Sequence, residues 1–270
     1  MAKLFEAKGR PRFNPLIAHV TDLGMAGRIA QLDERARRLA RAFWPGPLSL
    51  VAPVADPALV CDLARAGLDT VAVRAPAHDV AQAVLRAFAR PIVAPSANRS
   101  GRPSPTTLAD AVAETGAAAA LALDGGPCVI GLESTVVALL GGPPRLLRPG
   151  AVTRAQIEAL IGPLAEADAD AGRSPGRLTR HYAPAAPLRL DADAPRAGEA
   201  FLAFGPVPGG PAVFNLSPTR DLAEAAANLF SHLRAADALS PAAIAVAPIP
   251  DEGLGEAIND RLRRAAGYVG

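Results

Sequence analysis

The side chains best suited to chemistry lie in a polar segment, residues 95–107, that follows the short apolar run 92–94. The segment gathers small hydroxyls, an amide and two arginines, which are Ser96, Ser104, Asn98, Arg99 and Arg102. Loops after strands commonly bind ligands in α/β proteins, because their backbone is exposed while the sheet behind them is rigid. The composition favours a phosphate-bearing anion. Helix capping by Ser104 or Thr106 explains one hydroxyl and leaves the other polar side chains unaccounted for.

A second candidate site is the basic segment 8–19. Lysine occurs only at Lys3 and Lys8 among 28 basic residues, so Lys8 stands out against a background of arginine. A lysine offers a compact charge and an arginine a planar fork, so Lys8 with Arg10 around Gly9 suits a triphosphate. The alternative is a solvated basic turn without a ligand.

These segments need a scaffold, and the apolar pattern predicts one of α/β class. An amphipathic helix is predicted over 28–43, with further helices at 79–89 and 106–114. Predicted strands between the helices are 48–54, 70–75, 92–94, 119–123 and 134–140. A short turn at 141–144 would lead directly into a strand at 145–148, which makes the predicted sheet mixed rather than purely parallel. We therefore expect a twisted mixed sheet with flanking helices.

The second half of the chain predicts a smaller unit. After a helix at 153–161, residues 162–187 lack apolar periodicity and are rich in Ala, Asp, Gly and Pro, as interdomain linkers are. Strands at 188–190, 201–204, 212–215 and 243–247 then alternate with helices at 221–239 and 254–266. This order predicts a small Rossmann-like domain. It contains no Gly-x-Gly-x-x-Gly turn and no Walker loop, so we assign it no nucleotide.

Composition and charge narrow the function classes. Hydrophobic residues are 50% of the chain and charged residues 20%, as in globular proteins. No apolar run is as long as a membrane span and the start does not resemble an export signal, so we expect a cytoplasmic protein with Cys61 and Cys128 reduced. Residues 1–150 carry a net charge of +5 and residues 151–270 a net charge of −3. This modest surplus favours a local anion site over a broad nucleic-acid surface.

Several motifs, taken in order, resemble the L-threonylcarbamoyladenylate synthase family in its long, two-domain form. The segments that carry the resemblance are 8–19, 43–51, 95–107, 132–137, 147–153, 174–184, 221–230 and 253–262. The resemblance implies a catalytic domain over 1–162, a linker or lid over 163–187 and a Rossmann-like domain over 188–270. The family's usual first segment, with its Pro-Thr-Glu-Thr-Val-Tyr-Gly-Leu type motif, is not found. We expect either that the true start lies further upstream or that the chain is a natural fragment.

The family's reaction condenses L-threonine, bicarbonate and ATP into threonylcarbamoyl-AMP and releases pyrophosphate. The product is passed to a transferase that modifies adenosine 37 of tRNA. The resemblance thus implies a nucleotidyltransferase that uses Mg²⁺ with ATP, with the metal mainly on phosphate oxygens and no metal site made by the protein. Because the substrates supply the nucleophile, positioning and charge neutralisation do most of the work.

The family's functional residues fall on matching positions here. Lys8 and Arg10 are the implied catalytic residues. The implied ATP-binding residues are Arg10, Asn14, Thr70, Ser96, Asn98, Ser104, Arg148 and Tyr182. The implied threonine-binding residues are His19, Arg74, Ala94 through its backbone, and Ser134. Tyr182, with His181 or Arg180 as less specific neighbours, is expected to reach the phosphates from the lid.

Two other functions remain open from the sequence. Carbamoyl transfer of the hydrogenase-maturation type shares a similar first domain, but it predicts zinc-finger and acylphosphatase-like modules that this chain lacks. A double-stranded-RNA-binding or inactive relative is the non-enzymatic alternative, with weak RNA binding by the basic half. The missing family motif keeps that alternative open.

Overall fold

The computed structural model describes residues 1–166 and 181–267, and within them the chain forms two compact units. Unit 1 comprises Met1–Ser96, Leu123–Gly125 and the chain from 133 to 166. Unit 2 comprises Ala97–Ala122, Gly126–Leu132 and the chain from 181 onward. The polar loop and the helix after it therefore belong with the C-terminal sheet. The domain limits at 162 and 187 stay a prediction, and the middle of the expected linker lies outside the described residues.

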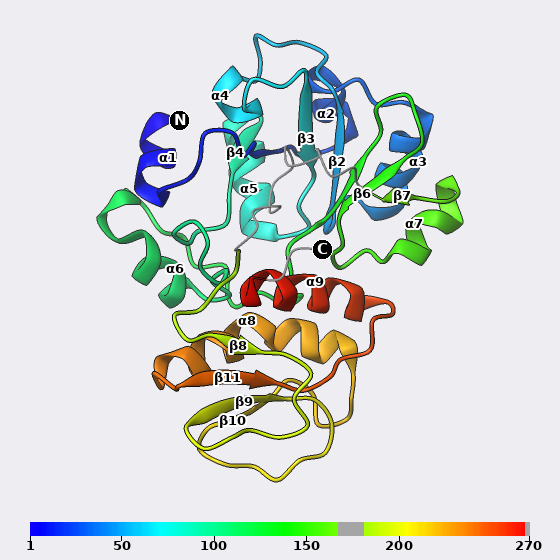
Figure 1. The fold of residues 1–270 in the computed structure, drawn as a ribbon. Helices are drawn as coiled ribbons and strands as arrows, with labels where there is room; N and C mark the ends of the chain where they lie inside the picture. The colour runs from blue at the N-terminus through cyan, green and yellow to red at the C-terminus, as the bar shows by residue number, and fades with distance from the viewer. Residues whose placement is uncertain (167–180, 268–270) are drawn as a thin grey trace. The chain divides into compact units, whose positions relative to one another are not determined.

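Unit 1 is built on a mixed sheet with the strand order β4-β1-β3-β2-β5-β6-β7 (Figure 1). Its strands are β1 (Ile17–His19), β2 (Leu48–Pro53), β3 (Thr70–Arg74), β4 (Ile92–Ala94), β5 (Thr135–Ala138), β6 (Arg145–Arg148) and β7 (Ala165–Glu166). Its helices are α1 (Ala2–Lys8), α2 (Leu23–Ile29), α3 (Glu34–Phe43), α4 (Asp62–Arg65), α5 (Asp79–Phe88) and α7 (Arg154–Ile161). Strand β1 runs parallel to β3 and antiparallel to β4, which confirms the predicted mixed sheet.

The two faces of this sheet are covered differently. On one face the main apolar core packs strand residues such as Leu50 and Val73 against α2, α3 and α7, through Ile29, Leu39 and Ile157. Alternate strand residues point to the other face. That face has a smaller apolar cluster, made by Val51, Ala72, Val136 and Ala138 with Ile17 and Leu147 at its margin. Polar side chains that lie beside this smaller cluster are therefore held by a packed sheet, on the face that the helices α2, α3 and α7 do not cover.

Unit 2 contains a four-stranded sheet with the order β10-β9-β11-β8, in which all pairs are parallel. The strands are β8 (Leu188–Arg189), β9 (Glu199–Ala203), β10 (Val213–Asn215) and β11 (Ala243–Val246). Helices α8 (Leu222–Ala238) and α9 (Leu254–Ala266) pack together on one face of it (Figure 1). The unit also holds α6 (Leu108–Thr115) and the short helix η1 (Gly116–Ala118). The parallel sheet confirms the Rossmann-like expectation.

The prediction of one continuous helix over 28–43 is wrong, because the chain forms two helices there. The chain forms α2 up to Ile29 and restarts as α3 at Glu34, where the carboxylate of Asp33 accepts a 2.8 Å hydrogen bond from the Ala36 backbone amide. Between the helices, Ala30 is extended and bridges to Val54. Leu32 is nevertheless buried in the same core as α2 and α3. The spacing of apolar residues indicates which residues are buried. Because Leu32 in the connection is buried like the residues of both helices, the spacing does not show where one helix ends and the next begins.

Two further local predictions are wrong. Residues 119–123 form no strand in the described structure, and Leu121 is 76% exposed. Alanine has low strand propensity, so a run of alanines does not form a strand unless a neighbour pairs with it. The N-cap of α6 is Thr107, whose hydroxyl accepts from the Asp110 amide at 3.2 Å. Neither Ser104 nor Thr106 has this capping role.

Candidate active site

The register of three strands brings the predicted threonine-binding residues to one face of the unit 1 sheet. His19 lies opposite Arg74, and Ile17 lies opposite both Ala72 and Ala94. Since directly opposite residues point to the same side and side chains alternate along a strand, His19, Arg74 and Ala94 share the face that carries the smaller apolar cluster. Positions 19 and 74 thus become direct neighbours, and position 94 lies on the same face opposite Ile17, two residues before His19.

His19 and Arg74 are electrostatically coupled. Burial, together with the nearby Arg74 guanidinium, lowers the pKa of His19 to about 4, so the imidazole is neutral at pH 7. Burial, together with repulsion from Arg148, lowers the pKa of Arg74 to about 10. Arg74 is oriented by a 2.9 Å hydrogen bond from Nε to the carbonyl of Gly46. At neutral pH the guanidinium is still charged, and this carbonyl gives it a hydrogen-bond acceptor but no counter-charge.

Arg148 reaches the same face because of an irregularity in the pairing of β5 with β6. Val137 lies opposite Leu146 but Val136 lies opposite Arg148, so β6 contains one extra residue at this point. Such a bulge changes the direction of the following side chain. Arg148 is 5% exposed and donates from Nε and Nη2 to the carbonyl of Ser134, at 3.1 and 2.8 Å.

Ser134 joins this group through its hydroxyl. Its Oγ lies 3.1 Å from Nη2 of Arg148 and 2.8 Å from Oγ of Ser49. Ser49 is fully buried and was missed by the sequence interpretation. Its signal is a hydroxyl within the otherwise apolar strand 48–54, since a buried hydroxyl needs a polar neighbour.

The cluster of His19, Arg74, Arg148 and Ser134 is cationic and largely desolvated. Among the described residues, no Asp or Glu forms an ion pair with Arg74 or Arg148. A buried guanidinium (Arg148) and a half-buried one (Arg74) that repel one another are costly without a counter-charge. The chemistry that this arrangement accommodates is the binding of a small anion such as a carboxylate.

A second polar group lies where β1 begins and β4 ends. Lys8, at the end of α1, is 9% exposed and donates from Nζ to the Ser96 carbonyl at 2.5 Å. Gly9 ends the helix in a left-handed conformation, with φ of 58°. Arg10 donates to the carbonyls of Asn14 and Pro15, at 3.2 and 2.9 Å. Within unit 1, the candidate segment 8–19 therefore contacts Ser96, which stands near the start of the candidate segment 95–107.

Asn14 is the most unusual residue of this second group. The side chain is 2% exposed, and neither Nδ2 nor Oδ1 has a hydrogen-bond partner among the described residues. A buried unsatisfied amide costs about 1–3 kcal/mol for each polar group. No interaction in the part of the chain that the structure describes offsets this free-energy cost. A polar ligand would offset it by accepting a hydrogen bond from Nδ2 of Asn14 and donating one to Oδ1.

The two groups occupy opposite ends of the same strands. Thr70 begins β3 and Arg74 ends it, on the same face, and four residues of strand span about 13 Å. Because β1 is parallel to β3, the segment with Lys8 and Asn14 lies toward the Thr70 end and His19 toward the Arg74 end. Arg148, which the resemblance assigns to ATP, lies instead beside Ser134 of the predicted threonine set.

Three predicted ATP-binding residues belong to unit 2. Asn98 is buried and donates from Nδ2 to the carbonyls of Arg99 and Arg102, at 2.8 and 2.9 Å, so it shapes its own loop. Ser104 is 7% exposed. Tyr182 is 1% exposed, and its ring packs 5.4 Å from the ring of Phe230.

The other residues of the predicted lid are only partly described. His181 packs edge-on against Tyr182, with 3.9 Å between the ring centroids. Arg180 and the rest of 167–180 lie outside the described residues. The contact of Tyr182 with ATP stays a prediction.

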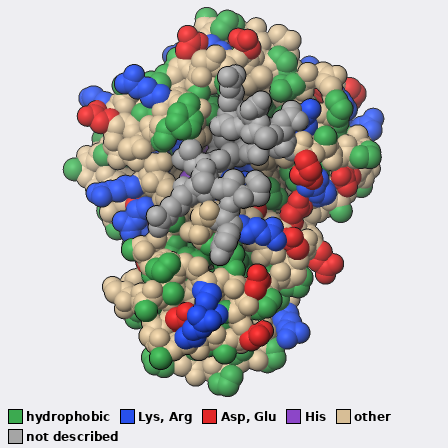
Figure 2. Space-filling model, viewed as in Figure 1, with side chains coloured by type: hydrophobic (Ala, Val, Ile, Leu, Met, Phe, Trp, Pro, Cys, Tyr) green, Lys and Arg blue, Asp and Glu red, His purple; other side chains and the backbone are tan. Residues whose placement is uncertain are grey.

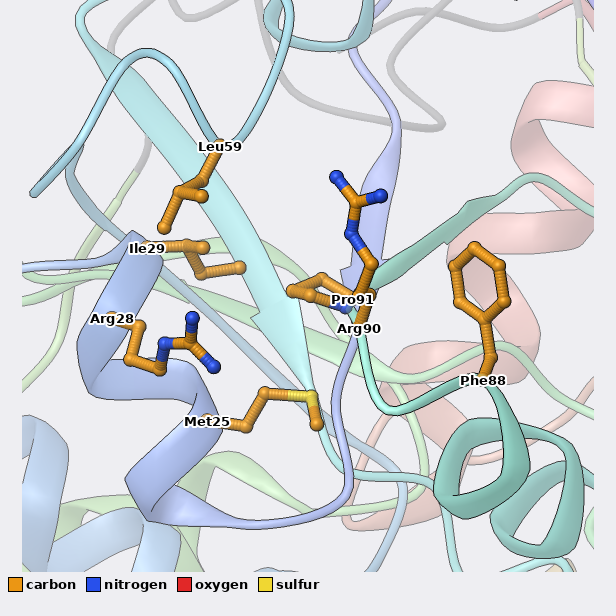
Figure 3. Close-up of a pocket in the computed structure, with 7 residues that line it drawn as sticks. All are labelled: Met25, Arg28, Ile29, Leu59, Phe88, Arg90 and Pro91. Carbon is orange, nitrogen blue, oxygen red and sulfur yellow. The ribbon is translucent and has the colours of Figure 1, made fainter.

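A separate hollow of about 250 Å³ lies on unit 1, lined by Met25, Arg28, Ile29, Leu59, Phe88, Arg90 and Pro91. Figure 3 shows the guanidiniums of Arg28 and Arg90 beside these apolar side chains. None of the predicted site residues lines it. Both arginines are exposed, so this hollow has no desolvated charge comparable with that of Arg74 or Arg148.

Neither a protein-made metal centre nor a membrane span is found in the described chain. No group of three or more His, Cys, Asp or Glu side chains within residues 1–166 and 181–267 is arranged to hold a metal ion. Within the same residues, every helix is too short or too polar to cross a bilayer.

Comparison with known proteins assigns the chain to a family. The family model described as "Telomere recombination" matches residues 1–150, and the model described as "Threonylcarbamoyl-AMP synthase, C-terminal domain" matches residues 152–267. The threonylcarbamoyl-AMP synthase of Pyrococcus abyssi is 39% identical, over 98% of this chain and 84% of its own length. The Bacillus subtilis enzyme of the same name is 38% identical, over 98% and 83%.

A solved structure agrees over the same extent. The crystal structure of P. abyssi Sua5 complexed with L-threonine matches with a TM-score of 0.90 and 37% identity, covering 99% of this chain and 84% of that one. High-coverage relatives that are named as synthases make the chain an enzyme of the nucleotidyltransferase class. On these matches and on its fold, the chain belongs to the threonylcarbamoyl-AMP synthase family, in the two-domain form.

Proposed function

We propose that this protein makes threonylcarbamoyl-AMP from L-threonine, bicarbonate and ATP, for threonylcarbamoylation of adenosine 37 in tRNA. The threonine amine and CO2 derived from bicarbonate form a carbamate, with loss of water. A carbamate oxygen then attacks the α-phosphorus of ATP, and pyrophosphate leaves with the electrons of the broken P–O bond. No protein nucleophile is needed, so the residues act by binding, orientation and neutralisation of charge.

The observation that carries this proposal is the cationic cluster on the sheet face. Arg74 and Arg148 are desolvated and repel one another, and they have no carboxylate partner in the described chain. The carboxylate of threonine supplies the missing counter-charge, and an arginine fork suits it geometrically. Neutral His19 accepts or donates a hydrogen bond at the threonine without adding a third positive charge.

The nucleotide is assigned to the Lys8 end of the same face. Lys8 and Arg10 supply positive charge, and the unpartnered amide of Asn14 supplies a donor and an acceptor. Ser96, Thr70, Asn98, Ser104 and Tyr182 complete the proposed ATP set. Thr70 and Arg74 are about 13 Å apart along β3. An adenylate that runs along the strand places its nucleotide at one end and its amino acid at the other.

Mg²⁺ fits this proposal as an ion brought in with ATP. The side chains described at the Lys8 end are cations, amides and hydroxyls, which are poor ligands for Mg²⁺ compared with carboxylates. The phosphates and water would therefore hold the ion, which would supply positive charge for the leaving pyrophosphate. Lys8 and Arg10 would supply further positive charge to the phosphates.

The test is pyrophosphate release from ATP by the purified chain. We expect release that requires both threonine and bicarbonate, with threonylcarbamoyl-AMP as the accompanying product. Release that is indifferent to the omission of threonine would contradict the proposal. Absence of release, with RNA retained on the purified protein, would favour the RNA-binding alternative.

On the face drawn in Figure 2, Lys and Arg side chains are interspersed with Asp and Glu and form no continuous basic surface.

Substitution at the Lys8 end tests the assignment of the ATP site. We expect Lys8→Ala to reduce adenylate formation about a hundredfold or more, as loss of one preorganised donor typically costs about 2.7–4 kcal/mol of barrier. Lys3→Ala is the matched control, because Lys3 lies on the same helix and is exposed. Arg10→Ala should reduce adenylate formation to a similar extent, with exposed Arg12→Ala as its control. Full activity in Lys8→Ala and Arg10→Ala would refute their roles.

A further inference from the structure

We propose that Arg234, on α8, is a positioning residue that holds the loop 98–104 in the shape that binds ATP. The inference rests on the proposed function, since it takes this loop to be part of the ATP site. The Arg234 guanidinium donates from Nη2 to the Pro103 carbonyl at 2.6 Å and from Nε to the Ser104 carbonyl at 3.4 Å. Both contacts lie within unit 2.

Glu114, on α6, ties the same guanidinium to the earlier part of the loop. Its Oε1 accepts from Nη2 of Arg234 at 3.0 Å, and its Oε2 accepts from the Arg99 backbone amide at 3.1 Å. Arg102 also pairs with Oε1, at 3.4 Å. The Glu114 side chain is only 5% exposed and that of Arg234 17%. One carboxylate and one guanidinium, both shielded from water, therefore fix the backbone of Arg99, Pro103 and Ser104.

The internal hydrogen bonds of the loop hold its first part, residues 98–102, and leave Pro103 and Ser104 to other anchors. The loop contains no helix or strand, and Gly101 takes a φ of 89°, which other residues rarely adopt. Asn98 closes it from inside through the carbonyls of Arg99 and Arg102. The Ala183 amide donates to the Gly101 carbonyl at 2.8 Å. The loop therefore depends on anchors that are remote in sequence, and Arg234 provides two of them.

This contact links the two family regions of the chain. The loop and Glu114 belong to the region matched by the first family model, whereas Arg234 belongs to the region matched as the C-terminal domain. The C-terminal region has no nucleotide-binding turn of its own. On this inference, and in addition to the proposed contact of Tyr182 with ATP, this region preorganises a loop of the catalytic region, so that ATP does not bear the cost of ordering it.

The choice of variant follows from the geometry. Arg234→Met would leave Glu114 as a buried charge without its main partner, and the chain could fail to fold. Arg234→Lys keeps the positive charge beside Glu114 but removes the planar fork that reaches Pro103 and Ser104 together. The matched control is Arg189→Lys. Arg189 pairs with Glu199 at 2.5 Å in the four-stranded sheet of the same unit, and its hydrogen bonds go to Glu199 and to the Ala194 carbonyl rather than to the loop.

Two measurements on the full chain decide the matter. In Arg234→Lys we expect the backbone amides of residues 99–102 and 104 to exchange hydrogen at least tenfold faster. The KM for ATP should rise about tenfold, and the KM for threonine and kcat should change less than threefold. Arg189→Lys should match the unmodified chain in all four. Unchanged exchange in the loop, or faster exchange with an unchanged KM for ATP, would overturn the inference. If the unmodified chain made no adenylate, the proposed function would fail, and the exchange rates alone would still decide whether Arg234 holds the loop.

Discussion

At the scale of single residues, the candidate site contains positive charges, those of Arg74 and Arg148, that do not stabilise the fold. Desolvated Arg74 lies beside Arg148 and beside a histidine whose pKa is lowered to about 4. Apolar residues at these positions would be cheaper for the apo protein, since buried ion clusters are often replaced without loss of stability. Polar groups that weaken a fold are typical of binding sites. This cost supports the proposal that a bound ligand supplies the counter-charge here.

The buried histidine gives stability a predictable pH dependence. His19 has a pKa of about 4 in the folded chain and about 6.5 when unfolded, so the unfolded chain binds more protons between these values. Stability is therefore lost as pH falls from about 6.5 toward 4. We expect the free energy of unfolding in urea to fall by about 2 kcal/mol between pH 7 and pH 5 through this group alone. Asp22 and Asp251, whose pKa values are lowered from near 3.8, contribute only at more acidic pH.

His19→Gln is the variant that isolates this effect. The glutamine amide keeps the capacity to form hydrogen bonds and does not titrate. The decrease in the free energy of unfolding between pH 7 and pH 5 should therefore be smaller in this variant than in the unmodified chain, by about 2 kcal/mol with a margin of about 1 kcal/mol. Urea unfolding at the two pH values measures it directly. The same decline in His19→Gln as in the unmodified chain would show that His19 is not the group that titrates.

At the scale of elements, the local sequence predicts which helices and strands form better than it predicts where each one begins and ends. Strands at 48–53, 70–74 and 92–94 were predictable because apolar residues there are bounded by Pro, Gly and polar residues. The break between α2 and α3 was not recognised, although Asp33 is a good N-cap residue, because the apolar spacing continues past it. The pairing irregularity at Val136 and Val137 leaves no sequence signal, yet it brings Arg148 to the site.

The cap that separates α2 from α3 is a testable contribution to stability. Asp33→Ala removes the acceptor for the Ala36 amide, and loss of an N-cap typically costs about 1 kcal/mol. We expect a decrease of this size in the free energy of unfolding by urea. Arg41→Ala serves as the control, because it removes only an exposed ion pair with Glu34 on the same helix and should cost about 0.5 kcal/mol or less. Equal effects in the two variants would mean that capping does not define this helix start.

At the scale of the whole molecule, sequence order and spatial grouping differ. Residues 97–122 and 126–132 lie between two parts of unit 1 in the sequence, yet they pack with the C-terminal unit. Glu114 and Arg234, which make part of that packing, are 120 residues apart. No local pattern predicts such a pair. Family resemblance could assign Asn98 and Ser104 to a site, but it could not show which remote side chain holds their loop.

Because the proposed threonine site lies within one unit, threonine should protect that unit selectively. His19, Arg74, Ala94 and Ser134 all belong to unit 1. A ligand at 100 times its Kd stabilises the folded state by about 2.7 kcal/mol. We expect threonine to raise the unfolding midpoint and to slow amide exchange in β1 and β3. Exchange in β9 and β11 of unit 2 should not change.

Arg74→Met should abolish this protection without weakening the apo fold. The substitution removes a desolvated charge and its repulsion with Arg148, which offsets the loss of the hydrogen bond to Gly46. Arg28→Met is the matched control, because Arg28 lies at the separate hollow of Figure 3 and is exposed. Threonine should protect Arg28→Met as it protects the unmodified chain. The reverse result, with protection lost in Arg28→Met and kept in Arg74→Met, would move the amino-acid site to that hollow and leave the cationic face without a ligand.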